Sequence, residues 1–371
     1  TVTDSAGVQI VESLTPGWGE DLPKIEAEPF LRLGREEEGP YQFAFLTRGL
    51  ILEDGRIAIP AIGAQEVRIF DSSGIHLTTF GGWGEGPGEF SNLAGLYEFP
   101  GDSLLVYDGR MRRATVFSLE TQGLRVLQNR AEGNYSVFGL AEGGPLFLFD
   151  LGRGFRPDLE PGLQWTMTEI LAMSPADGSY DSIATLPSRV QMVVQGGNTE
   201  PVTPPRWSTQ AAAEDGFYWA IPDEYVIGFY GPGGRMIRSL RRPVEPQPVE
   251  PRMVEDYIEA RLDEVRRREG DAAVPRYRAM YEEAAFGDFV PLFGLSCVDG
   301  DQRLWISGST WPAQGAPPRH WSVFSKDGAW LGDLEAPEGV RIVHARGDRV
   351  LGIWLDEMDV PYVQVHRLVF E

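Results

Sequence analysis

Short runs in which apolar and polar residues alternate, separated by turn residues, fill most of the chain. The clearest example is residues 67–90, VRIFDSSGIHLTTFGGWGEGPGEF. An apolar run to Phe70 is followed by the turn residues 71–74, a second alternating run through Phe80, and a glycine-rich loop closed by Phe90. Two alternating runs joined by four turn residues predict a β-hairpin.

This pattern recurs along the chain at a spacing of 47 residues. Residues 33–34, 38–40 and 43 align with residues 80–81, 85–87 and 90, and residues 68–70 align with residues 115–117. A constant period in the forties, with about four strands in each unit, is typical of a propeller blade, because one blade cannot bury both of its faces alone.

Six such units can be counted, each with an Asp or Gly turn before a short apolar strand. The six turn-and-strand segments are 54–59, 101–106, 143–148, 215–219, 300–306 and 347–353, and the six outer strands are 67–70, 115–117, 170–173, 226–229, 321–324 and 363–368. The sequence therefore predicts an all-β fold, a six-bladed β-propeller that occupies residues 1–371 as a single domain.

The first strand-like run, residues 8–11, is separated from the first full repeat by a turn-rich segment. Propellers commonly use an N-terminal strand to complete the last blade, which removes an exposed sheet edge. We therefore expect residues 8–11 to pair with the C-terminal sheet and close the ring.

Two insertions interrupt the repeats. Residues 186–213, with several prolines, are expected to form an irregular arm. Residues 241–289 begin with four prolines in nine positions, which predicts an extended spacer, and then change to a helical period at Val254, Ile258, Leu262 and Val265. A second amphipathic run follows Gly270. We predict a Pro-rich and helical insertion, a helical hairpin between blades four and five.

Charge narrows the range of partners. The chain has 55 acidic and 33 basic residues, a formal net charge of -22, and 42% of its residues are hydrophobic. A strongly negative surface repels phosphate backbones and anionic lipids, so nucleic acid is not an expected partner. A basic protein surface or a cation fits better.

The chain start and the cysteine content bear on the compartment. Cys297 is the only cysteine, so no internal disulfide can form, and its apolar neighbours predict a buried strand thiol. No apolar run approaches 18 residues, and the sequence begins at Thr1 instead of a methionine. We expect a mature exported product that is periplasmic or extracellular. A lipid anchor on a residue just upstream of Thr1 would also explain this start and would make the protein membrane-associated.

The hairpin and loop V-R-I-F-D-x-x-G and F-G-x-x-G-x-G-P-G-x-F resemble the NHL-type repeat. A closer resemblance is to a bacterial exported family of six-bladed β-propeller proteins, and it spans nearly the whole chain. The residues that carry it are 4–11, 224–227, 234–238 and 350–357. The resemblance implies the fold and an exported location but says little about activity, because that family is largely uncharacterised. NHL repeats often carry Asp and Arg before the outer hairpin, and only Asp108 and Arg113 match that pattern here.

The sequence contains no motif for catalysis. The four histidines, His76, His320, His344 and His366, are not spaced as metal ligands, and no nucleophile motif or phosphate-binding loop occurs. Acidic residues near expected strand ends, Asp108, Asp299, Asp301, Asp356 and Glu357, are more typical of turn capping than of a calcium site. We therefore assign no catalytic, cofactor-binding or metal-binding residue.

Candidate partner-binding residues lie in the insertions and loops. The basic run on the expected helix and the aromatic residues in expected loops could anchor another protein, or form a solvated helix face and local loop packing. The candidates are Tyr257, Arg261, Arg266, Arg267 and Arg268 on the helix, and Trp207 and Trp311 in loops, with Trp83 as a further loop aromatic.

Three hypotheses for function follow. The first is a non-catalytic exported scaffold that binds a protein, for example an extrinsic accessory subunit of a respiratory or photosynthetic membrane complex. The second is a metal-assisted hydrolase or lactonase, or a carbohydrate lyase, with its site at the tunnel mouth. The third is a sensor that binds a small ligand at the same mouth without chemistry.

Overall fold

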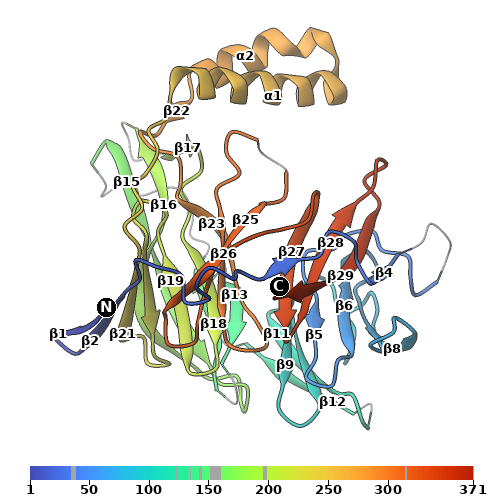
Figure 1. Cartoon of the computed structure of the whole chain (residues 1–371). Coiled ribbons are helices and arrows are strands. Elements are labelled where there is room, and N and C mark those ends of the chain that lie inside the picture. Colours follow the sequence, from blue (N-terminus) through green and yellow to red (C-terminus); the bar gives the residue numbers. More distant parts are fainter. Residues whose placement is uncertain are drawn as a thin grey trace.

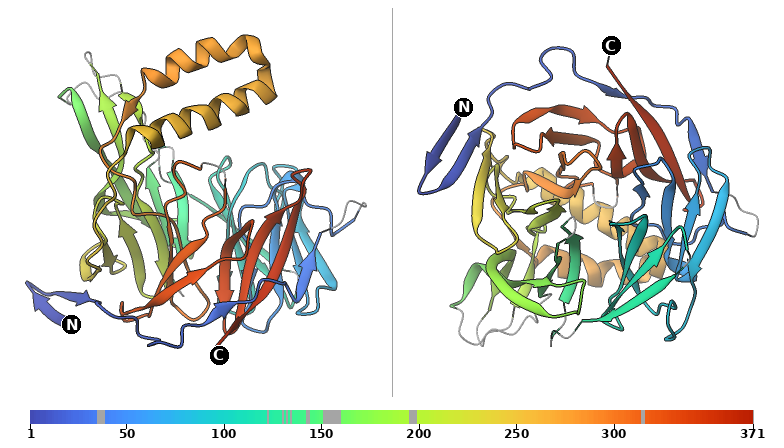
Figure 2. Two further views of the ribbon diagram at one scale, coloured as in Figure 1. Left: turned by 45° about the horizontal axis from the view of Figure 1, so that its top comes forward. Right: turned by 90° about the horizontal axis from the view of Figure 1, so that it is seen from below.

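The protein is a β-propeller, seen here in a computed structural model that describes residues 1–34, 39–121, 123–129, 131, 133, 135–141, 144–150, 160–194, 199–313 and 316–370. The strands of these residues form six sheets, which are arranged as a ring around a central opening (Figures 1 and 2). The predicted turn-and-strand segments coincide with β6, β10, β14, β19, β24 and β28, and the predicted outer strands with β7, β11, β15, β20, β25 and β29.

We number the sheets one to six in chain order. Sheet one contains β5 (Leu50–Ile51), β6 (Ile57–Ala61), β7 (Glu66–Phe70) and β8 (His76–Gly81). Sheet two contains β9 (Leu93–Phe99), β10 (Ser103–Asp108), β11 (Arg113–Ser118) and β12 (Leu124–Gln128). Sheet three contains β13 (Tyr135–Leu140), β14 (Leu146–Asp150), β15 (Gly162–Met173), β16 (Tyr180–Val193), β17 (Thr199–Thr203) and β22 (Ala285–Phe286).

The remaining three sheets have the same antiparallel core. Sheet four contains β18 (Thr209–Ala213), β19 (Gly216–Ala220), β20 (Val226–Tyr230) and β21 (Met236–Arg241), with β2 (Val8–Glu12) and β1 (Val2–Ser5) added at its edge. Sheet five contains β23 (Phe293–Val298), β24 (Leu304–Gly308), β25 (His320–Phe324) and β26 (Trp330–Glu335). Sheet six contains β27 (Val340–Arg346), β28 (Arg349–Leu355), β29 (Pro361–Val369), β3 (Lys24–Ile25) and β4 (Leu31–Leu33).

The first strands of the six sheets line the central opening and contact one another in order. The contacts run β5 to β9, β9 to β13, β13 to β18, β18 to β23, β23 to β27 and β27 back to β5. Six clusters of buried hydrophobic residues each join two neighbouring sheets. The core is therefore divided among the junctions, as expected when no sheet can bury both faces alone.

The ring closes at the N-terminus, but with a different strand from the one predicted. Residues 8–11 do not pair with the C-terminal sheet, because β2 lies parallel to β21 in sheet four, where Val11 pairs with Leu240 and is buried. The edge of β29 is covered instead by β4, where Leu33 pairs with Val363. Leu33 is 2% exposed and packs in the junction of sheets six and one, so burial at that junction selects this strand.

The glycine-rich loop after β8 makes a tight connection between sheets one and two. Gly81 has a φ of +98°, and a Cβ there would lie 2.7 Å from the Gln65 carbonyl oxygen and 2.9 Å from the Phe90 ring. Phe90 is fully buried at the junction of these sheets. The loop is therefore a packed crossover, as its sequence predicts; Glu38, in the matching loop one repeat earlier, lies outside the described residues.

The irregular arm expected at residues 186–213 is largely strand. β16 continues to Val193 as the partner of the extended β15, and β17 follows as a further strand. Pro187 does not end β16, because the pairing of β15 with β16 shifts register at this residue. Val190 and Val193 beyond it are buried, which supports the extension.

Two helices lie between β21 and β22, α1 (Pro251–Glu269) and α2 (Val274–Glu282). Pro251 occupies the first helical turn, where its missing N–H costs nothing, and Gly270 ends α1 with a φ of +82°. The buried face of α1 contains Ile258, Leu262 and Val265, at the helical spacing seen in the sequence. Figure 2 shows both helices at one end of the ring, over its central opening.

Candidate functional site

The end of the ring that carries α1 and α2 also carries the connections between sheets. In a four-stranded antiparallel sheet the first strand starts, and the last strand ends, at the same end. Because α1 follows β21, the last strand of sheet four in chain order, the connections between sheets lie on the side of the helices (Figure 1). We call this end the helix-bearing face, and the opposite end, with the turns that follow each first strand, the turn-bearing face.

Large apolar side chains are exposed on the helix-bearing face. Trp207, which precedes β18, is 65% exposed, and Trp83, which follows β8, is 64% exposed. The indole N–H of Trp83 donates to the Gly63 carbonyl oxygen at 3.2 Å, which fixes the ring in place. Further exposed apolar side chains on this face are Phe45, Met280, Phe289, Leu355 and Met358.

Two of the predicted partner-binding residues are buried. Tyr257 is 7% and Trp311 is 8% exposed, so at Trp311 the alternative of local loop packing holds. Their ring centroids lie 6.2 Å apart in a cluster that includes Ile258 and Leu262. The loop between β24 and β25 therefore holds α1 onto the ring through Trp311, because burying the hydrophobic face of the helix requires such a partner.

The arginine run of α1 is mostly paired with its own helix. Arg261 and Arg268 pair with Glu264, and Arg266 pairs with Asp263. Among the described residues Arg267 has no ion-pair partner, and its side chain is exposed. Arg267 and Arg268 are thus the members of the run that project into solvent.

A cavity of about 1250 Å³ occupies the centre of the ring. Its wall comes from the first strands of all six sheets and the turns that follow them. Apolar rings and polar groups alternate along it, including Tyr97, Phe138, Phe149, Gln210, Leu295 and Ser296. This volume exceeds that of a typical small-molecule site, so the cavity can admit a ligand together with water.

Carboxylates line the cavity near the turn-bearing face, and most of them are paired. Arg56 bonds Asp54 and Asp102, Arg346 bonds Glu98, and Lys326 bonds Glu214. Arg56 and Asp102 join sheets one and two, Lys326 and Glu214 join sheets five and four, and Arg346 and Glu98 join sheet six to sheet two across the end of sheet one. The carboxylates therefore stabilise the ring and are not gathered on one point.

Two arginines in the cavity wall differ from these, because neither has a carboxylate partner among the described residues. Arg341 donates to the Leu46 carbonyl oxygen at 2.6 Å, and Arg48 approaches the Tyr97 hydroxyl at 3.5 Å. Burial lowers the pKa of Arg341, with no carboxylate to oppose it. The centre of a strongly acidic protein therefore contains two uncompensated guanidinium groups.

His344 and Cys297 also line the cavity. The buried imidazole of His344 accepts a hydrogen bond from the Ile51 N–H at 3.2 Å, and burial, together with Arg346, lowers its pKa to about 3. Burial also raises the pKa of the Cys297 thiol. Cys297 lies in a strand, β23, as predicted, but it is half-buried where a buried thiol was expected. Both groups are uncharged at neutral pH.

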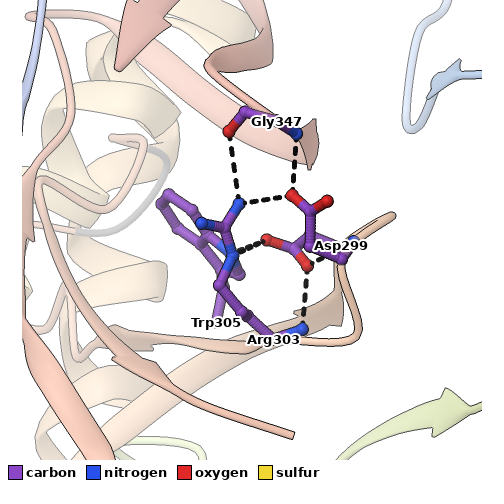
Figure 3. A network of polar contacts seen from close by, with 5 residues as sticks. Asp299, Arg303, Trp305 and Gly347 are labelled. Atoms are coloured by element: carbon purple, nitrogen blue, oxygen red, sulfur yellow. Dashed lines mark hydrogen bonds and ion pairs between the residues drawn. The ribbon is translucent and has the colours of Figure 1, made fainter. Parts of the chain in front are cut away.

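Asp299 is the most buried acidic side chain near the cavity, at 0% exposure (Figure 3). Its carboxylate accepts hydrogen bonds from the Arg303 guanidinium and the Trp305 indole, each at 2.7 Å, and from two backbone amides. Burial raises the pKa of Asp299, and these donors oppose the rise. Asp301 joins the same arginine and accepts from the Gly347 N–H, so the network ties sheet five to sheet six.

The other candidate ligands serve local structure. Asp108 accepts four backbone N–H groups and Asp356 accepts two, which confirms turn capping. The buried ring of His366 is hydrogen-bonded to the Glu26 carbonyl oxygen and to the Gln364 side-chain oxygen. The His320 side chain is exposed. Within the described ranges, no three His, Cys, Asp or Glu residues are placed to hold a metal ion.

Arg113 and Arg68 perform one task that the repeat alignment did not reveal. The Arg113 guanidinium donates to backbone carbonyls of residues 85, 86 and 89, and Arg68 donates to those of residues 39, 40 and 42. Each arginine thus holds the glycine-rich loop before its sheet. The two lie 45 residues apart, so a strict shift of 47 placed Glu66 opposite Arg113 and missed Arg68.

Comparison with solved structures supports the fold. A protein of Bacteroides fragilis named as exported aligns over 97% of this chain and 99% of its own, with 10% identity and a TM-score of 0.51. A member of the DUF4221 family from Bacteroides vulgatus aligns over 95% and 99%, with 9% identity and a TM-score of 0.55. A gluconolactonase of Xanthomonas campestris aligns over the whole of both chains, with 12% identity, but its TM-score of 0.47 is too low to support the fold.

These similarities concern the fold alone, because all are at or below 12% identity. No family model and no curated protein matches the sequence. The NHL-like character of the repeat therefore stays a resemblance. Among the described residues, no helix is both long enough and apolar enough to cross a membrane.

Proposed function

We propose that this chain is an exported six-bladed propeller that binds another protein through its helix-bearing face. In this proposal residues 241–289 are an insertion in a single propeller domain of residues 1–371. The protein acts outside the cytoplasm, in the periplasm or at the cell exterior. The resemblance to an exported family supports that location.

The observation that carries the proposal is the exposure of Trp83 and Trp207 on one face. Tryptophan is usually well buried, and exposed tryptophans in soluble proteins are enriched where a partner binds. Both side chains lie on the face from which α1 and α2 project. Arg267 and Arg268 add positive charge on the same module, which favours a partner with acidic groups beside an apolar patch.

The buried positions of Tyr257 and Trp311 give them a different role in this proposal. They hold the helical hairpin on the ring and so present its solvent side to the partner. Direct contact is assigned to Trp83, Trp207, Arg267 and Arg268. An extrinsic subunit of a membrane-bound complex, respiratory or photosynthetic, is the form of scaffold that we favour.

Site-directed photo-crosslinking in the native source tests this proposal. A photoreactive phenylalanine analogue at Trp83 or Trp207 is expected to give one defined adduct, and the same analogue at Ile75 is expected to give none. Ile75 is a matched control because it is 60% exposed and lies in a turn at the turn-bearing face. Equal adducts from Ile75, or none from both tryptophan positions, would contradict the proposal.

Purification in mild detergent provides a second measurement. The wild-type protein is expected to elute with one partner at a stoichiometric level, and W83A/W207A is expected to elute alone while keeping its thermal stability. A wild-type protein that elutes as a lone monomer would count against the scaffold role.

A further inference from the structure

The central cavity contains a pair of cationic groups that the proposed protein contact does not use. Arg48 precedes β5 and Arg341 lies in β27, and both line the cavity. Arg48 is three residues before Ile51, and Arg341 is three residues before His344. The Ile51 N–H bonds His344 and β5 contacts β27, so the two arginines come from adjacent segments of the cavity wall.

Most hydrogen-bond donors of these two groups are available to the cavity. A guanidinium has five N–H donors, and each arginine makes one hydrogen bond within the described residues. None of their side-chain nitrogens is both buried and unpartnered, so the remaining donors are not sealed inside the protein. Other arginines of the cavity wall, Arg56 and Arg346, are bound to carboxylates instead.

The nearby acidic groups do not neutralise the pair. Glu98 bonds Arg346, and its second oxygen accepts the Glu53 N–H. Glu53 lies five positions after Arg48, up to about 16 Å away along an extended chain. The arginine pair is therefore a local positive site in an otherwise acidic cavity.

We propose that Arg48 and Arg341 form a binding site for a small anion that carries a carboxylate or phosphate group. The planar guanidinium fork matches both oxyanions, and two forks on adjacent segments of the wall can bind one such group from two sides. The Tyr97 hydroxyl, which Arg48 approaches, supplies a neutral polar contact beside the pair. Phe138, Phe149 and Leu295 can cover an apolar part of the ligand.

Calorimetric titration with succinate and, separately, with inorganic phosphate tests this site. Binding of either anion by the wild-type protein is expected, with no binding of succinamide, which has the same carbon skeleton without charge. R48Q and R341Q are each expected to weaken anion binding by about tenfold or more, because each variant loses a charge-assisted contact to the anion. R252Q is the matched control, because the Arg252 side chain is 90% exposed on α1 and its removal changes net charge equally.

Chemical protection of the wild-type protein tests the site without any variant. Phenylglyoxal modifies accessible arginines, and the anion that binds is expected to protect the peptides that contain Arg48 and Arg341 but not the peptide that contains Arg252. Failure of both anions to bind would overturn the proposal. The proposal would also be overturned if R252Q weakened anion binding as much as R48Q and R341Q do. The same holds if the anion left the peptides of Arg48 and Arg341 open to modification. These results are independent of the crosslinking at Trp83 and Trp207, so the two proposals can fail separately.

Discussion

The imidazole of His344 accepts a hydrogen bond from the backbone N–H of Ile51, 293 residues away in the sequence, and so joins sheet six to sheet one. The acceptor must be a neutral nitrogen, because a protonated imidazole has only donors. Burial in the cavity wall keeps the ring in that neutral state by lowering its pKa to about 3. One uncharged side chain thus contributes to the seam at which the ring closes.

The first prediction concerns acid stability. The unfolded chain binds a proton at His344 near pH 6.5, whereas the folded chain resists protonation until about pH 3. His344 should therefore lower the free energy of unfolding by roughly 1.4 kcal/mol for each pH unit across that window, as pH falls. H344N, whose side-chain oxygen can still accept the Ile51 N–H, should show a shallower acid dependence in denaturant titrations between pH 6.5 and pH 4.

H320N is the control for this measurement, because His320 is exposed and should leave the slope unchanged. Parallel acid profiles for the wild-type protein and H344N would show that the histidine is not held neutral.

The second prediction concerns ring closure. L33A removes a buried side chain of β4 at the junction of sheets six and one, and should lower the free energy of unfolding by about 2–5 kcal/mol. Thermal unfolding and denaturant titration measure the loss. L14A, at a residue that is 66% exposed in the same N-terminal segment, should change stability by less than about 0.5 kcal/mol. An L33A protein as stable as L14A would mean that β4 does not support the ring.

Much of this architecture follows from sequence, but the closing strand does not. The short apolar strands were predictable because each begins after an Asp or Gly turn and alternates with period two, as at Ile57 and Leu104. β4 has three residues, too few to show a period. Leu33-Gly34 aligns with Phe80-Gly81, the end of β8, but two aligned residues do not by themselves define a strand. Residues 8–11 gave the stronger strand pattern, and only the burial of Leu33 separates the two candidates.

The functional surfaces were less predictable, because they depend on contacts between distant sheets. Trp207 and Trp311 both lie in proline-containing loops next to strands. α1 nevertheless covers Trp311, whereas Trp207 is exposed. Arg48 and Arg341 lie 293 residues apart, and no local pattern distinguishes them from the paired arginines. The spacing of the helix, by contrast, identified its buried face.

The third prediction concerns the network around Asp299. D299N keeps the size of the side chain but removes the buried charge beside the Arg303 guanidinium, which keeps Asp301 as a partner, and should destabilise the protein by about 1.5–3 kcal/mol. Chemical denaturation at neutral pH measures this loss. D348N removes an exposed partner of Arg367 and should cost less than about 1 kcal/mol. Similar losses in both variants would show that burial does not strengthen the Asp299 contact.

The fourth prediction concerns the attachment of the helices. W311A removes the ring that contacts Tyr257, so amides of α1 should exchange with deuterium faster, while β24 and β25 keep their protection. W207A removes an exposed indole and should leave exchange in α1 unchanged. Unchanged protection of α1 in W311A would place its main anchor elsewhere.

The pairing of β4 with β29 also constrains the order in which the molecule can form. Residues 31–33 are synthesised long before their partner strand, which spans Pro361–Val369. Until β29 is made, β4 lacks this partner strand and the first and last sheets cannot meet. The nascent chain therefore remains an open arc until β29 has been made, and a product that stops short of β29 has no route to a finished circle.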